Sequence, residues 1–292
     1  MGGAVTASKP GWGSAVPTLI AVWRRLRALN PAVAVLELRM RMRGFRPFIS
    51  LLAYTSLLAL AALIYMLVAG QNSFRPDHSG TIGRDLFTVV SCVQLALVFL
   101  LLPGGAAGAI ALEREKGTFE LVRASLLRPV DIVTGKFAVL IAYGAILMAS
   151  SLPLAAWCLL LGGIAPEEIL LVYVHLVVTA LWLVGLGLLF SAAMRRSIPA
   201  VVGTYGVILA MLGLPCLTVL LELVPSRHSW DHVIEYALAF WPATAPVSIL
   251  MEEGPTGHWS PLTHWIIGTG AYFALACVLF PLAILVLRRR RV

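Results

Sequence analysis

Between two apolar runs the sequence reads Ala111-Leu-Glu-Arg-Glu-Lys-Gly-Thr-Phe-Glu-Leu-Val-Arg-Ala-Ser-Leu-Leu-Arg-Pro-Val-Asp-Ile-Val-Thr-Gly-Lys136. It is the one long charged insert between apolar segments of this chain. Each Glu, Arg or Lys costs about 2.5–3.5 kcal/mol at the centre of a bilayer, so Glu113 to Lys116 alone would cost roughly 10 kcal/mol there. We therefore expect residues 113–136 to lie in water at a membrane face.

The centre of this insert predicts a short amphipathic helix. Gly117 is expected to end the preceding helix and Thr118 to cap a new one, whose first turn then holds Glu120, where the helix dipole favours an acid. Arg123 follows one turn later, and the apolar positions form a single stripe: Phe119, Val122 and Leu126. Pro129 is expected to begin the next helix. Such a helix at a membrane face indicates a docking site, and the alternative is a solvated loop with charges that flank the membrane.

The composition is that of an integral membrane protein. Of the 292 residues, 60% are hydrophobic and 12% are charged, whereas soluble chains carry about 25% charged residues. Six apolar stretches are each near the roughly 20 residues that span a bilayer. They are residues 48–69, 86–112, 137–161, 169–194, 199–224 and 265–287. We therefore predict an all-α integral membrane protein with six transmembrane helices, located in the plasma membrane.

Proline and glycine recur within these stretches. Proline at positions 103, 153, 215 and 281 predicts kinks that neighbouring helices can accommodate. Glycine pairs offer small faces for close helix packing: Gly104 with Gly108, Gly185 with Gly187, and Gly268 with Gly270. Such pairs are common in any apolar stretch, so packing is their default interpretation.

The segments outside the spans have separate characters. Residues 1–17 are rich in Gly, Ser and Pro and predict a disordered tail, and residues 18–46 predict an amphipathic segment at the membrane interface. The domain of six spans then covers 47–292. Within it, residues 225–264 contain a short amphipathic run, Trp residues suited to the interface, and proline breaks. This segment predicts either a re-entrant element or a helix lying on the surface.

The distribution of basic residues predicts the orientation. If the N-terminus, residues 113–136, Arg195-Arg196 and the C-terminus share one side, that side holds 19 of the 22 Lys and Arg residues. The positive-inside rule makes it cytoplasmic, with both termini there. The positive-inside rule therefore accounts for the net charge of +8, and we expect no nucleic-acid partner.

Two parts of the chain carry a resemblance to a known family. Glu-Arg-Glu-Lys-Gly-Thr-Phe-Glu-Leu at 113–121, followed by Arg-Pro-Val-Asp-Ile-Val-Thr-Gly-Lys at 128–136, resembles the cytoplasmic loop of ATP-binding-cassette exporter permeases of the type-two family. Leu126 and Arg128 depart from that pattern, where Pro and Ser or Thr are common. Residues 30–46 are similar to the elbow helix that precedes the first span in these permeases.

The resemblance implies a partner and a site. In the family the short helix of this loop docks in a groove of a separate ATPase subunit, and two permease copies or paralogues form the transport path. It also implies export, an elbow at 18–46 and a re-entrant outer segment at 225–264. The coupling residues that it implies are Glu113, Glu115, Lys116, Gly117, Thr118, Phe119, Glu120, Val122, Arg123 and Leu126.

The chain has no nucleotide-binding or catalytic motif of its own. Thr134-Gly135-Lys136 lacks the remainder of a phosphate-binding loop, because Val130 replaces its first glycine and Phe137 its Ser or Thr. We expect no cofactor or metal in this chain, with ATP bound by the partner subunit. Two ionisable residues within the spans, His175 and Glu222, are candidate pathway residues, with structural hydrogen bonding as the alternative. A secondary transporter, or another polytopic membrane protein without an ATPase, remains the alternative function.

Overall fold

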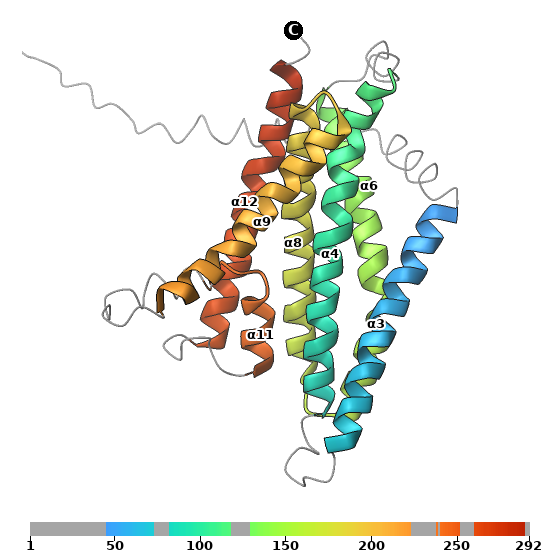
Figure 1. The fold of residues 1–292 in the computed structure, drawn as a ribbon, viewed down its shortest axis with the longest axis vertical. Helices are drawn as coiled ribbons and strands as arrows, with labels where there is room; N and C mark the ends of the chain where they lie inside the picture. Colours follow the sequence, from blue (N-terminus) through green and yellow to red (C-terminus); the bar gives the residue numbers. More distant parts are fainter. Residues whose placement is uncertain are drawn as a thin grey trace, which may run out of the picture.

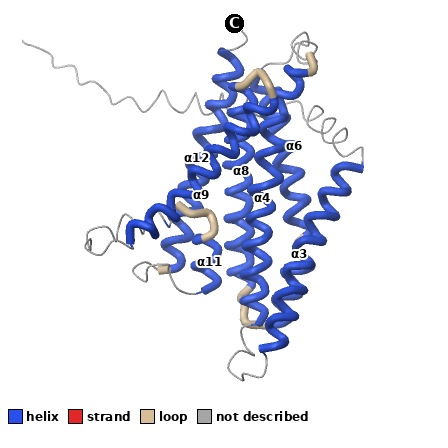
Figure 2. Tube along the Cα trace, viewed as in Figure 1, coloured by secondary structure: helices blue, strands red, loops and turns tan. Residues whose placement is uncertain are grey.

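The computed structural model describes residues 45–72, 82–117, 129–222, 238, 240–251 and 260–289. Within these ranges the chain is helical and contains no strand (Figure 2). The helices are α3 (Phe45–Asn72), α4 (Ile82–Glu115), α6 (Pro129–Ser150), α7 (Leu152–Leu161), α8 (Pro166–Ala193), α9 (Ser197–Glu222), α11 (Thr244–Met251) and α12 (Pro261–Arg289). The all-α prediction is confirmed.

Among the described residues, five helical segments are long and apolar enough to cross a membrane. They are Phe48–Ala69, Ile82–Glu115, Val130–Leu161, Pro166–Ala193 and Pro261–Arg289. The predicted span at 199–224 coincides with α9, but the apolar part of α9 found among the described residues, Ser197–Gly213, is shorter than these five segments. Five of the six predicted spans therefore coincide with helices that are long and apolar enough to cross a membrane, and the sixth stays a prediction.

The long helices run alternately up and down (Figure 1). The first residues of α3, α6 and α9 and the last residues of α4, α8 and α12 all lie at the upper end in that view. The turn between α7 and α8 and the short helix α11 lie at the lower end. Helix α8 is central and packs against α4, α6, α9 and α12. Helix α9 starts beside α8 and leans away from the bundle toward its lower end (Figure 1).

One predicted span is divided in the structure. The predicted span 137–161 consists of two helices, because the chain makes a turn at Ser151 and Pro153 lies in the first turn of α7. The hydroxyl of Ser151 accepts a hydrogen bond from Gln94 Nε2 at 2.9 Å and lies 2.7 Å from the Tyr173 hydroxyl. This buried polar contact holds the break against α4 and α8. In contrast, α4 and α12 continue as helices through Pro103 and Pro281.

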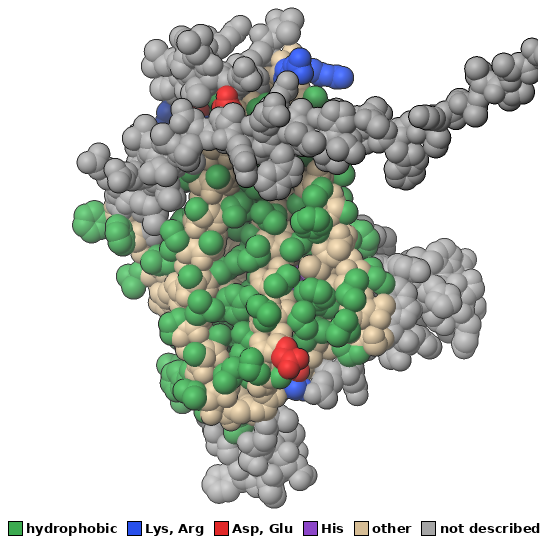
Figure 3. Space-filling view, turned by 180° about the vertical axis from the view of Figure 1, so that it is seen from behind, with side chains coloured by type: hydrophobic (Ala, Val, Ile, Leu, Met, Phe, Trp, Pro, Cys, Tyr) green, Lys and Arg blue, Asp and Glu red, His purple; other side chains and the backbone are tan. Residues whose placement is uncertain are grey.

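The surface matches a membrane environment. Large apolar side chains are exposed along the outside of the bundle, for example Leu52 at 70% and Leu160 at 84%. Figure 3 shows hydrophobic side chains over the middle of one face and charged side chains near its two ends. Exposed apolar surface on this scale suits lipid, because soluble proteins rarely expose apolar patches larger than a few hundred Å².

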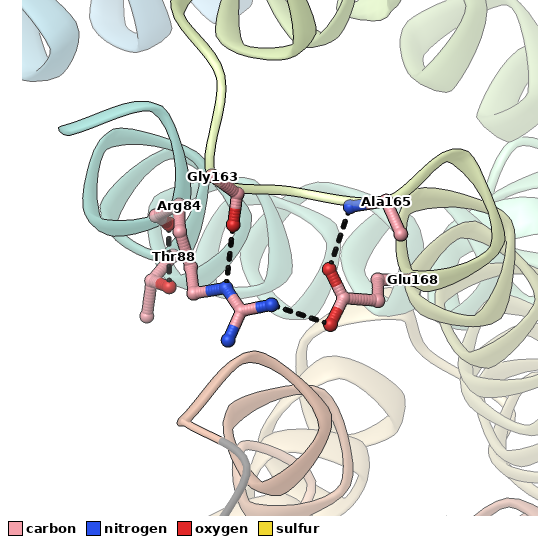
Figure 4. Close-up of polar contacts among 5 residues, drawn as sticks. All are labelled: Arg84, Thr88, Gly163, Ala165 and Glu168. Atoms are coloured by element: carbon pink, nitrogen blue, oxygen red, sulfur yellow. Dashed lines mark hydrogen bonds and ion pairs between the residues drawn. The ribbon is translucent and has the colours of Figure 1, made fainter. Parts of the chain in front are cut away.

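At the lower end an ion pair joins α4 to the start of α8 (Figure 4). Arg84 Nη2 lies 2.8 Å from Glu168 Oε1, and Arg84 Nε donates to the Gly163 carbonyl at 2.8 Å. The other oxygen of Glu168 accepts from the Ala165 N–H at 2.8 Å and so caps α8. Beside this ion pair, the start of α4 packs closely against the turn between α7 and α8. A Cβ on Gly83 would lie 2.2 Å from the Gly162 carbonyl oxygen. The lower ends of α4 and α8 are therefore fixed to one another.

Several predictions fall wholly or mainly outside the described residues. The tail at 1–17 lies outside them, as does the elbow at 18–46 except for Phe45 and Arg46, which begin α3. Of the outer segment 225–264, the structure describes 238, 240–251 and 260–264. There α11 is a helix of 8 residues that packs against α12, α8 and α4.

Candidate functional site

Three consecutive charged residues at the end of α4 each contact a different element. Successive residues of an α-helix point about 100° apart, so Glu113, Arg114 and Glu115 face three directions. Glu113 contacts α6, Arg114 contacts the end of α8, and Glu115 contacts the start of α9. We call these three residues the α4 hub. It forms the first three residues of the charged segment 113–136, at which the sequence predicts a docking site.

The first contact of the hub is an ion pair with α6. Lys136 Nζ lies 2.6 Å from Glu113 Oε1, and the two side chains are 8% and 31% exposed. The sequence predicts that both charges lie in water, but the structure places Lys136 among the buried residues. It can lie there because a carboxylate at hydrogen-bond distance offsets part of the cost of removing the ammonium group from water.

The second contact holds the C-terminal end of α8. Arg114 Nη1 donates to the carbonyls of Ala192 at 3.0 Å and Met194 at 3.2 Å. The last carbonyls of a helix have no partner within the helix, and a cation is favoured at this end of the helix dipole. Arg114 therefore satisfies the end of α8 from outside the helix.

The third contact provides α9 with a cap from another helix. One oxygen of Glu115 accepts from the Ser197 N–H at 3.1 Å and from the Ser197 hydroxyl at 2.5 Å. The first N–H groups of a helix lack partners within the helix, and a carboxylate suits the positive end of its dipole. The start of α9 is thus bonded directly to the end of α4.

Close packing beneath the hub joins α4 to α8. The hydroxyl of Ser191 accepts from the backbone N–H groups of Ile110 at 2.8 Å and Ala111 at 3.0 Å. A Cβ on Gly187 would lie 2.5 Å from the Cβ of Ala106. The two helices approach this closely because both present small residues at the crossing.

Helix α4 ends at the predicted position. Gly117 has φ +73°, a conformation that suits glycine, and its N–H donates to the Arg114 carbonyl at 3.1 Å. Lys116 is exposed at this turn, and α6 begins at Pro129 as the sequence predicts. The remaining predicted coupling residues lie outside the described part of the chain: Thr118, Phe119, Glu120, Val122, Arg123 and Leu126.

The two candidate pathway residues lie far from the hub. His175 is fully buried in α8, with Nδ1 2.8 Å from the Thr269 hydroxyl and Nε2 3.0 Å from the Pro242 carbonyl oxygen. The ring also meets Tyr272 edge-on, at a centroid distance of 5.9 Å. His175 therefore joins α8 to α12 and to the segment before α11. Glu222 is the last residue of α9, and its side chain lies outside the described part.

Comparison with known proteins assigns this chain to a family. The family described as ABC-2 family transporter protein matches residues 85–287. The chain belongs to this family. The match runs from near the start of α4 to near the end of α12, so it includes the whole charged segment 113–136 and with it the hub. A comparison with curated proteins found no match. The chain is an ABC-2 transporter membrane protein with several transmembrane helices. No ATPase domain was found in it.

Sequence reasoning missed part of the hub of this ABC-2 protein. Arg114 and Ser197 were not among the predicted coupling residues, yet both take part in its contacts. A weak pattern was present, because Ser197-Ile-Pro199 has a polar residue and an early proline where a helix starts. The pairing itself was invisible, because the partners are 78 to 82 positions apart in the chain.

Proposed function

We propose that this ABC-2 protein is the permease subunit of an ATP-driven exporter, energised by a separate ATPase that docks at residues 113–136. The observation that carries the proposal is the α4 hub, because the residues that open the charged segment are bonded to α6, α8 and α9. A force applied to that segment would reach three helices directly. If the ATPase docked at a loop without such contacts, its movement could not be passed directly to the transmembrane helices.

The proposed orientation places the hub and both termini in the cytoplasm. Of the nine Lys and Arg residues in the described ranges, eight belong to the helix ends and turns at the upper end in Figure 1, and Arg84 alone belongs to the lower end. By the positive-inside rule this bias supports a cytoplasmic upper end. With α9 as the sixth span, the lower end, including α11, faces outward.

The complete transporter requires further parts. A path between two membrane domains needs a second permease copy or paralogue, and we propose that residues 18–46 form an elbow at the cytoplasmic face. We propose that residues 225–264 form a re-entrant outer segment around α11. Both ring nitrogens of His175 already have partners. That arrangement favours a role in holding the outer segment over direct contact with substrate, and Glu222 stays a candidate pathway residue.

The test of this function is retention of the ATPase by variants of the docking helix. Phe119 is the aromatic residue of the predicted apolar stripe, and a buried aromatic anchor is worth on the order of 2 kcal/mol or more, or roughly a thirtyfold change in affinity. We expect Phe119→Ala to reach the membrane at the parent level and to lose the ATPase during purification. Glu120→Gln removes a dipole contact of only about 0.3–1 kcal/mol and should retain most of it.

The measurement is co-purification of the ATPase with the tagged permease at matched membrane expression. Arg195→Ala serves as the control, because Arg195 is exposed in the turn between α8 and α9. If Phe119→Ala retained the ATPase fully, the alternative that residues 113–136 form only a solvated loop would be favoured. Absence of any ATPase from the parent preparation would count against the proposed function itself.

A further inference from the structure

Helices α4 and α8 are joined along their whole length. At the lower end Arg84 pairs with Glu168 at 2.8 Å, and near the middle the rings of Phe99 and Trp182 are 6.1 Å apart. At the upper end Ser191 and Arg114 supply the hydrogen bonds described above. Because both ends and the middle are fixed, these two helices behave as one body.

The described contacts of helix α9 with this body lie toward the start of the helix. Its Ala200 packs with Ala107 and Ala111 of α4, and the Tyr205 hydroxyl donates to the Leu100 carbonyl. Ile208, at 3% exposure, is the last buried residue among the described side chains of α9. Leu209 is 66% exposed, Met211 and Leu212 still pack against the core but are only partly buried, and α9 as a whole leans away from the bundle toward its lower end (Figure 1). A helix whose described contacts lie toward its start can tilt about that end.

We propose that the bond between Glu115 and Ser197 transmits displacement of the docking segment to α9, so that both are positioning residues of the transport cycle. This inference rests on the proposed function. The docking segment is residues 113–136, and Glu115 lies within it, two residues before the turn at Gly117. Its carboxylate holds both the N–H and the hydroxyl at the attached end of α9. A small tilt at that end moves the far end of the helix by a larger distance.

The alternative for these residues is a static cap. The same two hydrogen bonds would then only stabilise the first turn of α9, and α9 would keep its angle to α8 throughout the cycle. The two cases differ in one observable quantity, the nucleotide-dependent distance between a point on α9 beyond Ile208 and a point on α8.

The experiment places spin labels on exposed positions of α9 and α8. Leu209 is 66% and Leu170 is 64% exposed, so Leu209→Cys and Leu170→Cys provide label sites with little loss of packing. The four native cysteines are replaced first, and labelled chains are diluted with unlabelled ones so that distances within one copy dominate. The distance distribution is measured by pulsed electron paramagnetic resonance on the complex with its ATPase, with and without ATP and vanadate.

Variants at Ser197 separate transmission from simple capping. Ser197→Pro removes both donors, and proline is tolerated at the first position of a helix. Ser197→Thr keeps both donors. The parent, Ser197→Thr and the control Arg195→Ala are expected to show a shift between Leu209 and Leu170 on trapping. Ser197→Pro and Glu115→Ala are expected to lose it, and Glu115→Gln, which keeps an acceptor oxygen, to retain it.

Two results would overturn this inference: a parent complex without a shift at α9, or a full shift in both Ser197→Pro and Glu115→Ala. If Ser197→Pro fails to fold, Ser197→Ala replaces it and should reduce the shift. Failure of this inference can be distinguished from failure of the proposed function. Ser197→Pro is expected to retain the ATPase whether or not the shift is lost, whereas the proposed function fails if the parent itself binds no ATPase.

Discussion

The crossing of α4 and α8 beneath the hub can be tested by adding one methyl group. Gly187→Ala places a Cβ 2.5 Å from the Cβ of Ala106 and 3.0 Å from both the Ala107 nitrogen and the Pro103 carbonyl oxygen. Two of these three atoms are backbone and the third is the only side-chain carbon of an alanine, so none can rotate away. The helices must separate for the variant to fold.

The expected cost follows from that geometry. Overpacking a closely packed core costs about 1–3 kcal/mol. The better helix propensity of Ala over Gly opposes this by at most about 1 kcal/mol. We therefore expect Gly187→Ala to lose about 1–2 kcal/mol of stability, with a lower unfolding midpoint and weaker attachment of the hub.

The assay is thermal unfolding of the purified protein in one detergent, compared with Gly270→Ala. Gly270 lies on α12, and a Cβ added there meets no atom within 4 Å. Its substitution should leave the midpoint unchanged or raise it slightly. If Gly187→Ala matched Gly270→Ala, α4 and α8 would not be packed as closely as described, and the rigid body assigned to them would be wrong.

Two further predictions concern the ends of the bundle. Glu168→Ala should lower stability by about 1–3 kcal/mol, because it removes the ion pair to Arg84 and the acceptor of the Ala165 N–H. Replacing the exposed neighbour, Glu167→Ala, should change stability by no more than about 0.5 kcal/mol. Equal unfolding midpoints for the two variants would refute the role of the ion pair. Single cysteines at Lys116 and Arg289, in a background without native cysteines, should react in intact cells only with membrane-permeant thiol reagents, whereas one at Glu167 should react with an impermeant reagent, and labelling of position 116 from outside would contradict the proposed orientation.

Short-range features of this chain were predictable because they depend on neighbouring residues. Gly117 ends α4 and Pro129 begins α6 as the sequence predicts, since glycine accepts a positive φ and proline suits a first helical turn. The positions of the long helices were predictable for a related reason. A run of about 20 apolar residues suits a bilayer whatever surrounds it.

Glycine shows where local reasoning stops. Gly104, Gly108, Gly187 and Gly270 looked alike in the sequence as packing residues. In the structure a Cβ on Gly187 would collide with α4, one on Gly104 would lie 3.0 Å from the Tyr205 hydroxyl oxygen, and those on Gly108 and Gly270 would meet no atom within 4 Å. Which small residue supports a crossing depends on the rotation of two helices about their axes, and no short stretch of sequence contains that information.

The sequence by itself determined that this chain is helical, that it belongs in a membrane, and that residues 113–136 form its charged segment, because each follows from apolar length and the cost of burying charge. The three separate contacts of Glu113, Arg114 and Glu115 were decided only by the tertiary structure. Their partners lie 23 to 82 positions away. Such pairs form only after α4, α6, α8 and α9 have packed, since packing alone sets which helix end meets which charge.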